Sequence, residues 1–350
     1  MTAVPLPLAE ARSVVAQARA VGRRRSMSVA IVLAAGAAVV LCFTLALGDY
    51  PVAVSDVPAA IFGHGDARDV FVVQHLRLPR AFAALLVGAA FGFSGAIFQS
   101  LARNPLASPD ILGITSGAAV AAVFVITVAG GTHTRLSVAA FAGAAIVALT
   151  IYGLAYRAGV STYRLVLVGI GVGAVCQAIT SYLLASSNVY LVGQAIVWLT
   201  GSLNSIGWSA VVPLAVAVAA LTLPTLALAA PLRILQLGDN TAQGLGIRLE
   251  TVRLSLILVA VALVAAGTAA VGPVAFVAFV APPIARRLTR ASGLTLVPAA
   301  LTGALLVLAA DFVAQHAFGT ELPVGVVTGM VGGTYLLWLI SRANRIGRGG

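Results

Sequence analysis

The chain has 350 residues, of which 60% are hydrophobic and only 9% are charged, and its mean hydropathy is +1.05. Because a soluble domain carries about a quarter charged residues, this composition is typical of a protein that crosses a membrane many times. All 21 basic residues are arginine, which excludes a Walker A phosphate loop, since that loop requires a lysine. The arginines are spread between apolar segments, so we expect them to reflect membrane topology and not a nucleic-acid partner.

The first apolar run follows an arginine-rich segment. Residues 1–27 contain five arginines and are predicted to form a cytoplasmic tail, and residues 28–48 a first membrane span. A cleaved signal peptide also begins with basic residues, but its apolar core is shorter and ends in a small-residue cleavage site. We therefore expect this span to be retained.

Nine further apolar runs predict an all-α polytopic membrane protein with about ten transmembrane helices. Residues 28–341 are expected to form one transmembrane domain, followed by a cytoplasmic tail at 342–350. The nine runs are 80–101, 111–130, 136–156, 164–185, 208–230, 252–272, 273–289, 294–315 and 323–341. The run at 273–289 begins after Gly272 with Pro273 and is short for a full crossing.

The positions of the arginines predict the orientation. Ten crossings place both termini on one side, and 17 of the 21 arginines then fall on that same side. Cytoplasmic loops are enriched in basic residues, so both termini are predicted in the cytoplasm, with the chain in the inner membrane. The four arginines expected outside are Arg68, Arg77, Arg80 and Arg135.

Arg77 and Arg80 end the longest external segment, residues 49–79, and run against the positive-inside trend. A pair of guanidinium groups is suited to binding carboxylates of a partner protein. Two interfacial arginines whose side chains reach toward water are the alternative. The acidic residues and histidines of the segment match no ligand spacing, so no metal site is predicted.

Glycines at a spacing of four residues recur in three of the predicted spans. They are Gly88 and Gly92, Gly169 and Gly173, and Gly325, Gly329 and Gly333. Such spacing allows helix backbones to approach closely, which predicts helix packing. In the last span the same glycines are also compatible with space for a solute path.

Few ionisable residues lie within the apolar runs. Asp110 and Asp311 are placed near span ends, where interfacial water is expected. Ion-coupled carriers usually have carboxylates near the middle of the membrane, so this pattern argues against a secondary transporter. Cys42 and Cys176 fit no metal or redox spacing. No catalytic residue and no cofactor is predicted.

Residues 231–253 interrupt the apolar pattern with five charges. Asp239, after Gly238, is expected to provide a carboxylate N-cap for a short helix over Asn240–Leu245. Gly246 is expected to end that helix in the left-handed conformation, and a second helix is expected to begin at Leu249. The segment is therefore predicted to form a two-helix elbow at the cytoplasmic membrane surface, with a plain connecting loop as the alternative.

Together these segments resemble the FecCD family, the permease subunits of type II ABC importers for iron-siderophores, haem and vitamin B12. The resemblance runs from about residue 40 to the C-terminus and rests on several motifs in the family's order. They are RLPR at 77–80, GAIFQSLARNPLASPDILG at 95–113, STYRLVLVGIGVG at 161–173, WLTGSL at 198–203, LGDNTAQGLGIR at 237–248 and ELPVGVVTG at 321–329.

The resemblance implies roles for three groups of residues. The elbow would hold the coupling helices that dock on the ATPase, with the family pattern matched by Gly238, Asp239, Ala242, Leu245 and Gly246. Arg77 and Arg80 match arginines that receive acidic residues of the substrate-binding protein. The cytoplasmic end of the path would be closed by Asn104, Leu106, Thr162 and Tyr163.

Two positions depart from the family pattern. Gln315 stands where some relatives carry a further external arginine, and Pro282-Pro283 replaces the usual Pro-His or Pro-Gln. The tract GPVAFVAFVAPPIARRLTR at 272–290 is most similar to the ferric catecholate siderophore branch.

The function implied by the resemblance is transport without catalysis. The chain is expected to be an importer permease for a ferric siderophore, with vitamin B12 or haem as alternative cargo and an ion-coupled carrier as a less favoured reading. Its expected partners are two ABC ATPase subunits, an extracytoplasmic siderophore-binding protein, a second permease copy or paralogue, and membrane lipid.

Overall fold

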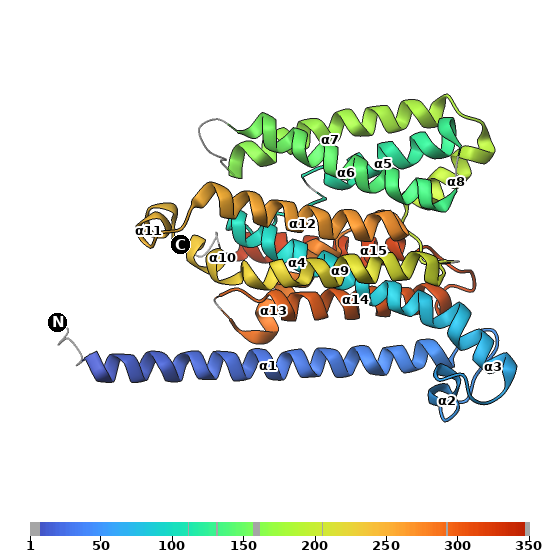
Figure 1. Cartoon of the computed structure of the whole chain (residues 1–350), viewed down its shortest axis with the longest axis horizontal. Coiled ribbons are helices and arrows are strands. Elements are labelled where there is room, and N and C mark those ends of the chain that lie inside the picture. Colours follow the sequence, from blue (N-terminus) through green and yellow to red (C-terminus); the bar gives the residue numbers. More distant parts are fainter. Residues whose placement is uncertain are drawn as a thin grey trace.

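The computed structural model describes residues 8–110, 112–130, 132–156, 162–204, 206–291 and 293–346. These residues form a bundle of helices that lie nearly side by side (Figure 1). The long helices are α1 (Leu8–Ala46), α4 (Leu78–Ala102), α6 (His133–Ala155), α7 (Thr162–Ala185), α9 (Trp208–Ala227), α12 (Leu249–Val271), α14 (Leu296–His316) and α15 (Val324–Ile346).

Shorter helices complete the bundle and its two ends. They are α2 (Val57–Ile61), α3 (Ala67–Phe71), α5 (Ile114–Phe124), α8 (Val189–Leu199), α10 (Ala229–Leu235), α11 (Asp239–Gly244) and α13 (Val277–Thr289). Two π-helical stretches extend longer helices, η1 (Val72–Arg77) before α4 and η2 (Val125–Ala129) after α5.

Figure 1 shows two groups of helices and two distinct ends. Helices α5 to α8 form a layer beside a larger body that contains α4, α9, α12, α14 and α15, and α1 lies along α14. The short α11 lies at one end of the bundle, hereafter the α11 end, and α2 and α3 lie at the other, the α3 end. Helix α1 begins at the α11 end and α15 runs back toward it, which agrees with an even number of crossings.

The predicted spans correspond well to the observed helices. Within the described residues, seven helices are long and apolar enough to cross a membrane, and each coincides with a predicted span. The predicted spans at 111–130 and 323–341 coincide with shorter apolar helices, Ile114–Ala129 and Val324–Leu339. A further short apolar helix, α8, was not predicted.

The predicted span at 273–289 forms only the short α13. Its 13 residues cover about 20 Å at 1.5 Å per residue, less than the roughly 30 Å of a bilayer core. Residues 273–276 before it are irregular, and Phe276 has a left-handed φ of 65°. This segment therefore enters the bundle partway along its length and reaches the α11 end as a half-length helix.

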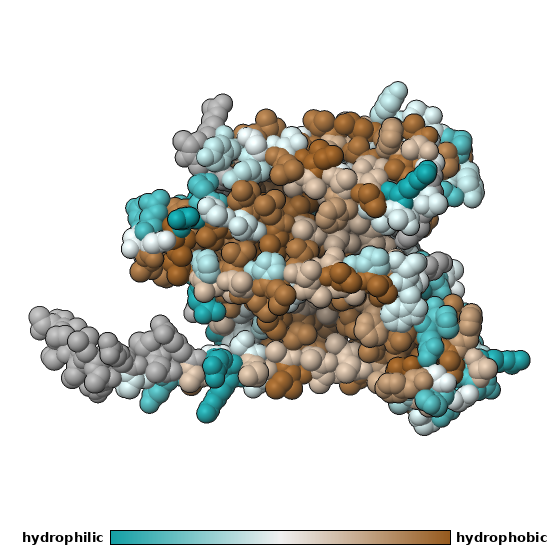
Figure 2. All heavy atoms as spheres, viewed as in Figure 1, coloured by the Kyte–Doolittle hydropathy of each residue, from teal (hydrophilic) through white to brown (hydrophobic). Residues whose placement is uncertain are grey.

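The outer surface of the bundle is apolar between two polar ends. Figure 2 shows hydrophobic residues along the middle of the visible face and hydrophilic residues concentrated toward the two ends. Helix α7 exposes Leu167 and Ile170, at 57% and 53%, and α9 exposes Val212 and Val216, at 54% and 64%. Apolar exposure of this extent in water would favour aggregation, whereas a lipid bilayer solvates it.

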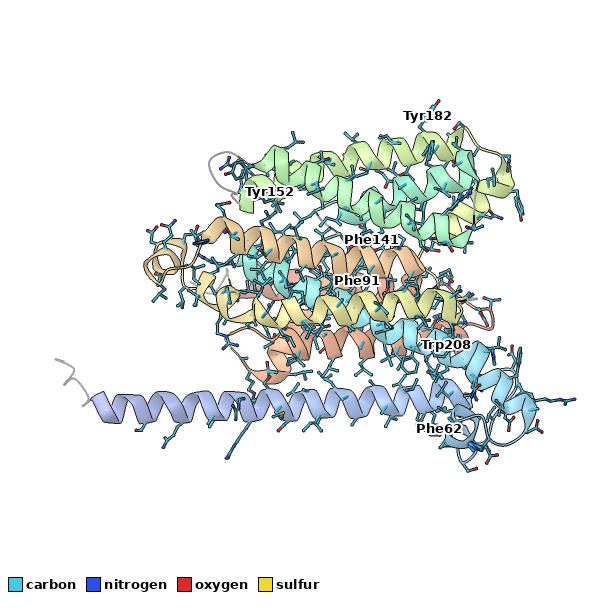
Figure 3. The ribbon with its side chains drawn as sticks, in the orientation of Figure 1. Phe62, Phe91, Phe141, Tyr152, Tyr182 and Trp208 are labelled. Carbon is cyan, nitrogen blue, oxygen red and sulfur yellow. The ribbon has the colours of Figure 1, made fainter. Side chains whose placement is uncertain are left out.

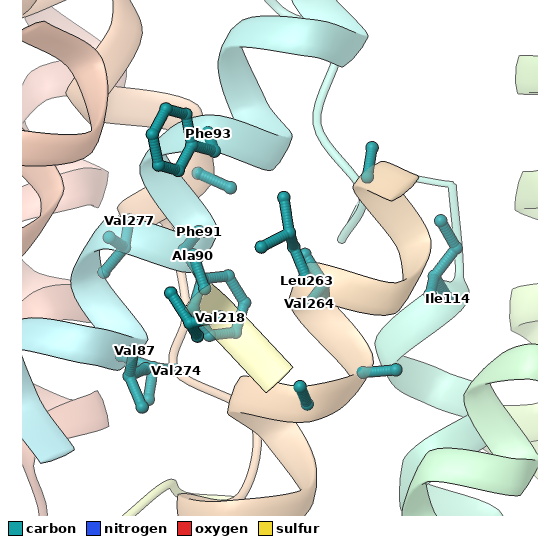
Figure 4. Close-up of a cluster of buried hydrophobic side chains, with 14 of the residues drawn as sticks. Val87, Ala90, Phe91, Phe93, Ile114, Val218, Leu263, Val264, Val274 and Val277 are labelled. Carbon is teal, nitrogen blue, oxygen red and sulfur yellow. The ribbon is translucent and has the colours of Figure 1, made fainter. Parts of the chain in front are cut away.

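Helix α4 is the most buried long helix and forms the centre of the core. Phe91 is fully buried against residues of α12, including Leu263 and Val264 (Figure 4). On the adjoining face of α4, a Cβ at Gly88 would overlap the carbonyl oxygen of Gly303, and one at Gly92 would overlap that of Ala299. Glycine is required at both positions because α4 and α14 are in backbone contact.

The other two glycine series differ from one another. A Cβ at Gly169 would lie 2.8 Å from the carbonyl oxygen of Leu112, so this glycine permits close packing of α7. In the last helix, a Cβ at Gly325 would overlap the carbonyl oxygen of Thr200, whereas at Gly329 and Gly333 it would meet no described atom within 4 Å. The prediction that these glycines allow close helix packing is therefore correct for Gly325, whereas Gly329 and Gly333 leave open space along α15.

Candidate functional site

The elbow at the α11 end forms largely as the sequence predicts. Gly238 has φ +113°, Gly246 has φ +82°, and α12 begins at Leu249. Both positive φ values lie in the region that favours glycine. The prediction that Asp239 is the N-cap is wrong, because α11 begins at Asp239 itself, Gly238 occupies the cap position and no side chain caps the helix.

The carboxylate of Asp239 instead joins a cluster of charges. Nη2 of Arg253, in the second turn of α12, lies 2.8 Å from both carboxylate oxygens. Nη2 of Arg103, directly after α4, lies 3.4 Å from Oδ1 and donates to the carbonyl oxygen of Leu235 at 2.7 Å. We call Arg103, Asp239 and Arg253 the α11 charge cluster. It connects the ends of α4 and α10 to the starts of α11 and α12.

The elbow also presents an apolar surface beside these charges. Leu237 and Leu245 flank α11 and are 65% and 60% exposed, whereas Ala242 between them is fully buried. Two exposed leucines on a polar end of the bundle are typical of a surface that contacts another protein. Leu245 was identified from the sequence and Leu237 was not, since its exposure depends on the turn at Gly238.

The predicted gate residues lie at the same end of the bundle. The Asn104 side-chain oxygen accepts a hydrogen bond from the Leu106 N–H at 2.9 Å, which closes a tight turn. Leu106 is 42% exposed and Tyr163 is 76% exposed. The backbone of Thr162 begins α7, but its side chain lies outside the described residues.

The chain that follows this turn re-enters the bundle. Leu112 and Gly113 lie against Gly169 of α7, which is about 10 Å along that helix from its first residue. Asp110 hydrogen-bonds to the Thr115 side chain and the Phe276 backbone, and its Oδ2 is buried without a partner among the described residues. Asp110 therefore does not lie at a wet span end, which corrects the expectation drawn from its sequence position.

At the α3 end, both predicted docking arginines have partners within the chain. Arg77 donates to the carbonyl oxygens of Leu45, at 2.7 Å, and Tyr50. Arg80 makes a bidentate pair with Asp311, with Nε to Oδ2 and Nη2 to Oδ1 both 3.0 Å. These contacts could not be predicted from a local pattern, because Asp311 is 231 residues away from Arg80.

Asp311 is fully buried, which corrects the expectation that water reaches it. Gln315 donates to its Oδ2 at 2.7 Å, and the Arg80 side chain is only 12% exposed. Glu321, 53% exposed, lies 3.4 Å from the other arm of Arg80. Gln315, where some relatives carry arginine, thus completes the hydrogen bonding of a buried carboxylate.

Nearby contacts fix the loops at this end. The Trp208 indole N–H donates to the Gln74 carbonyl oxygen at 2.8 Å, and its ring packs on Phe82 with centroids 6.0 Å apart. Figure 3 shows Trp208 where α9 meets the start of α4. A hydrogen bond to Asp69 raises the pKa of the Tyr50 phenol.

A cavity of about 1160 Å³ opens at the α3 end between α8, the end of η2 and the turn before α15. Its polar lining includes Tyr190, Gln194, Asn204 and Glu321, and Trp198 contributes a large aromatic ring. The volume is sufficient for a small-molecule ligand. Sequence reasoning missed the cavity because α8 was not predicted and the lining comes from separate segments.

A family model described as the FecCD transport family matches residues 36–342. The chain belongs to the FecCD transport family. It is a multi-pass transport subunit and not an enzyme. The FecCD chain is 41% identical over 323 residues to the ferric enterobactin transport system permease protein FepG of Escherichia coli, covering 92% of the chain and 98% of FepG.

Two further comparisons support the assignment of the chain to a family of ABC transporter permeases. It is 40% identical over 322 residues to the achromobactin transport system permease protein CbrC of Dickeya dadantii, covering 91% of the chain and 90% of CbrC. Its fold matches a solved chain from an ABC transporter described as of metal-chelate type, in an inward-facing conformation. That match has a TM-score of 0.81 at 25% identity and covers 90% of this chain and 99% of the other.

Proposed function

We propose that this FecCD permease imports a ferric siderophore of the catecholate type across the inner membrane. The observation that carries the proposal is the 41% identity to the ferric enterobactin permease over nearly the whole of both chains. The cavity at the α3 end supports it, because aromatic and hydrogen-bonding groups such as Trp198, Gln194 and Asn204 suit a ligand with aromatic rings and polar edges.

The two ends of the bundle are assigned to different partners. The α11 end faces the cytoplasm and contacts an ABC ATPase subunit through the elbow, with Leu237 and Leu245 as apolar contacts, so that the two elbows of a permease dimer meet two ATPase subunits. The α3 end faces an extracytoplasmic siderophore-binding protein. A second permease, either a copy of this chain or a paralogue, completes the transporter and meets the turn at Leu106 and the start of α7 at Tyr163.

Transport in reconstituted vesicles tests the proposed cargo. The complete complex should accumulate a labelled ferric tricatecholate when binding protein and ATP are supplied, and an ATPase that cannot hydrolyse ATP should abolish uptake. Ferric hydroxamate, ferric citrate, haem and vitamin B12 serve as competing cargoes. Preferred uptake of vitamin B12 or haem would reject the catecholate assignment, and uptake driven by an ion gradient without ATP hydrolysis would favour a secondary carrier.

The docking assignment requires a substitution that avoids the buried ion pair. Reversing Arg80 would place a second carboxylate beside Asp311, so Arg77 is the cleaner position. Arg77→Gln should weaken binding-protein affinity by at least about tenfold if its guanidinium also binds an acidic residue of the partner. Arg135→Gln, at an exposed arginine predicted on the same side, is the matched control. Equal affinity for both variants, measured by biolayer interferometry on nanodiscs, would remove Arg77 from the docking surface.

A further inference from the structure

The α11 charge cluster joins the elbow to the turn that carries two of the predicted gate residues. Arg103 has a left-handed φ of 49° and ends α4, and Asn104 follows it directly. The Arg103 side chain turns back across the elbow to the Leu235 carbonyl oxygen and to Asp239. A cation at the C-terminus of α10 also interacts favourably with the helix dipole.

The turn after Arg103 is held together by its own hydrogen bonds. The Asn104 N–H donates to the Gln99 carbonyl oxygen at 3.2 Å, and the Ala107 N–H donates to that of Asn104 at 3.1 Å. The bond from the Leu106 N–H to the Asn104 side chain closes the same turn. Residues 103–107 therefore form one unit, and a displacement of Arg103 displaces Leu106.

The elbow is equally well anchored on its own side. Ala242 is fully buried, and its carbonyl oxygen accepts from the Ile247 N–H at 3.0 Å. Arg253 binds both oxygens of Asp239 and thereby fixes the start of α11 to α12. Asp239 therefore connects the turn to the elbow, because its carboxylate contacts Arg103 of the turn and Arg253 of α12.

We infer that Arg103 is a positioning residue that transmits movement of α11 to the turn at 103–107 through Asp239 and Leu235. The inference rests on the proposed function, in which an ATPase moves α11. Half of the Arg103 side chain is exposed, so the contact contributes little to stability. The contact acts by fixing geometry, because the Arg103 guanidinium donates to two acceptors on the elbow, the Asp239 carboxylate and the Leu235 carbonyl oxygen.

The test uses the complete complex in nanodiscs with Arg103→Gln, Arg103→Lys and the control Arg24→Gln. Arg24 is exposed on α1, outside both the elbow and the charge cluster. Stimulation of ATP hydrolysis by loaded binding protein should fall at least about fivefold in Arg103→Gln, the lower end of typical coupling between sites. Arg103→Lys should recover part of it by donating to Leu235, and Arg24→Gln should match the wild type.

A distance measurement separates positioning from a general loss of structure. Spin labels at Leu106 and Asn240, in a chain whose two cysteines are replaced by alanine, should give one narrow distance distribution with and without nucleotide. Arg103→Gln should broaden it, also in the isolated permease. Full stimulation in Arg103→Gln, or lost stimulation with an unchanged distribution, would overturn the inference. If loaded binding protein did not stimulate ATP hydrolysis by the wild-type complex, the proposed function would be overturned instead. The distance distributions in the isolated permease would still test whether Arg103 holds the turn at 103–107 to α11.

Discussion

Helix α4 carries an arginine near each end, and the two arginines make ion pairs of different kinds. At the α3 end, Arg80 and Asp311 are 12% and 0% exposed and form a bidentate pair. At the α11 end, Arg103 and Asp239 are 50% and 47% exposed and lie 3.4 Å apart. The first pair cannot separate without leaving a charge in a medium of low dielectric constant, whereas water can replace the second.

This difference divides α4 into a fixed part and an adjustable part. The buried pair joins α4 to α14, and farther along the same two helices Gly88 and Gly92 bring the backbones into contact. The exposed pair joins the other end of α4 to an elbow made of short helices and glycine turns. We therefore expect conformational change to concentrate at the α11 end, with α4 and α14 moving together.

The largest effect is expected from breaking the buried pair. Asp311→Asn keeps the shape of the side chain but leaves the half-exposed Glu321 as the counter-charge of the buried Arg80, which should lower stability by roughly 3–5 kcal/mol. Thermal unfolding of the purified permease, followed by tryptophan fluorescence, measures the change. Glu321→Gln is the matched control, because Glu321 contacts the same arginine but is 53% exposed, and it should cost about 1 kcal/mol or less.

A double substitution sharpens the same test. Arg80→Met with Asp311→Leu removes both charges and should be close to the wild type in stability, since a buried pair often contributes little beyond an apolar replacement. If Asp311→Asn were as stable as Glu321→Gln, the α3 end would not be fixed in the manner described.

The buried pair also illustrates what the sequence could not predict. The helical periodicity, the long apolar runs and the arginine distribution are local properties, and they predicted the spans and the common side of the two termini. The partner of Arg80 is set by how α4 packs on α14, which no local pattern encodes. The same holds for Asp110, whose burial follows from the re-entrant course of the chain after α4.

Within the elbow, the accuracy of the sequence reading depended on the kind of residue. Gly246 was predicted correctly because a left-handed backbone is a local requirement that glycine meets. Asp239 was misread as a cap because an arginine of the next helix competes for its carboxylate. The helix α8 was missed because its 11 residues are too few for a span.

A smaller effect is expected where the two helices of the fixed part touch. Gly88→Ala would force the new methyl group into the Gly303 carbonyl oxygen, so it should destabilise the protein by about 1–3 kcal/mol. Gly329→Ala is the matched control, because a Cβ there meets no described atom within 4 Å. Thermal unfolding of both variants checks the expectation, and equal loss in the two would show that the close contact between α4 and α14 does not govern stability.

The smallest effect on stability is expected from the exposed pair. Asp239→Asn removes the charge shared by Arg103 and Arg253 while retaining an oxygen that accepts a hydrogen bond. Because Asp239 is about half exposed, the loss should be no more than about 1 kcal/mol, and raising the salt concentration should reduce the difference from the wild type. Thermal unfolding at about 0.05 M and 1 M sodium chloride measures both expectations.

A loss as large as that of Asp311→Asn, or one unaffected by salt, would mean that the α11 end is held as firmly as the α3 end, and the proposed division of α4 would fail. A small loss of stability together with impaired coupling would instead place the role of Asp239 in movement.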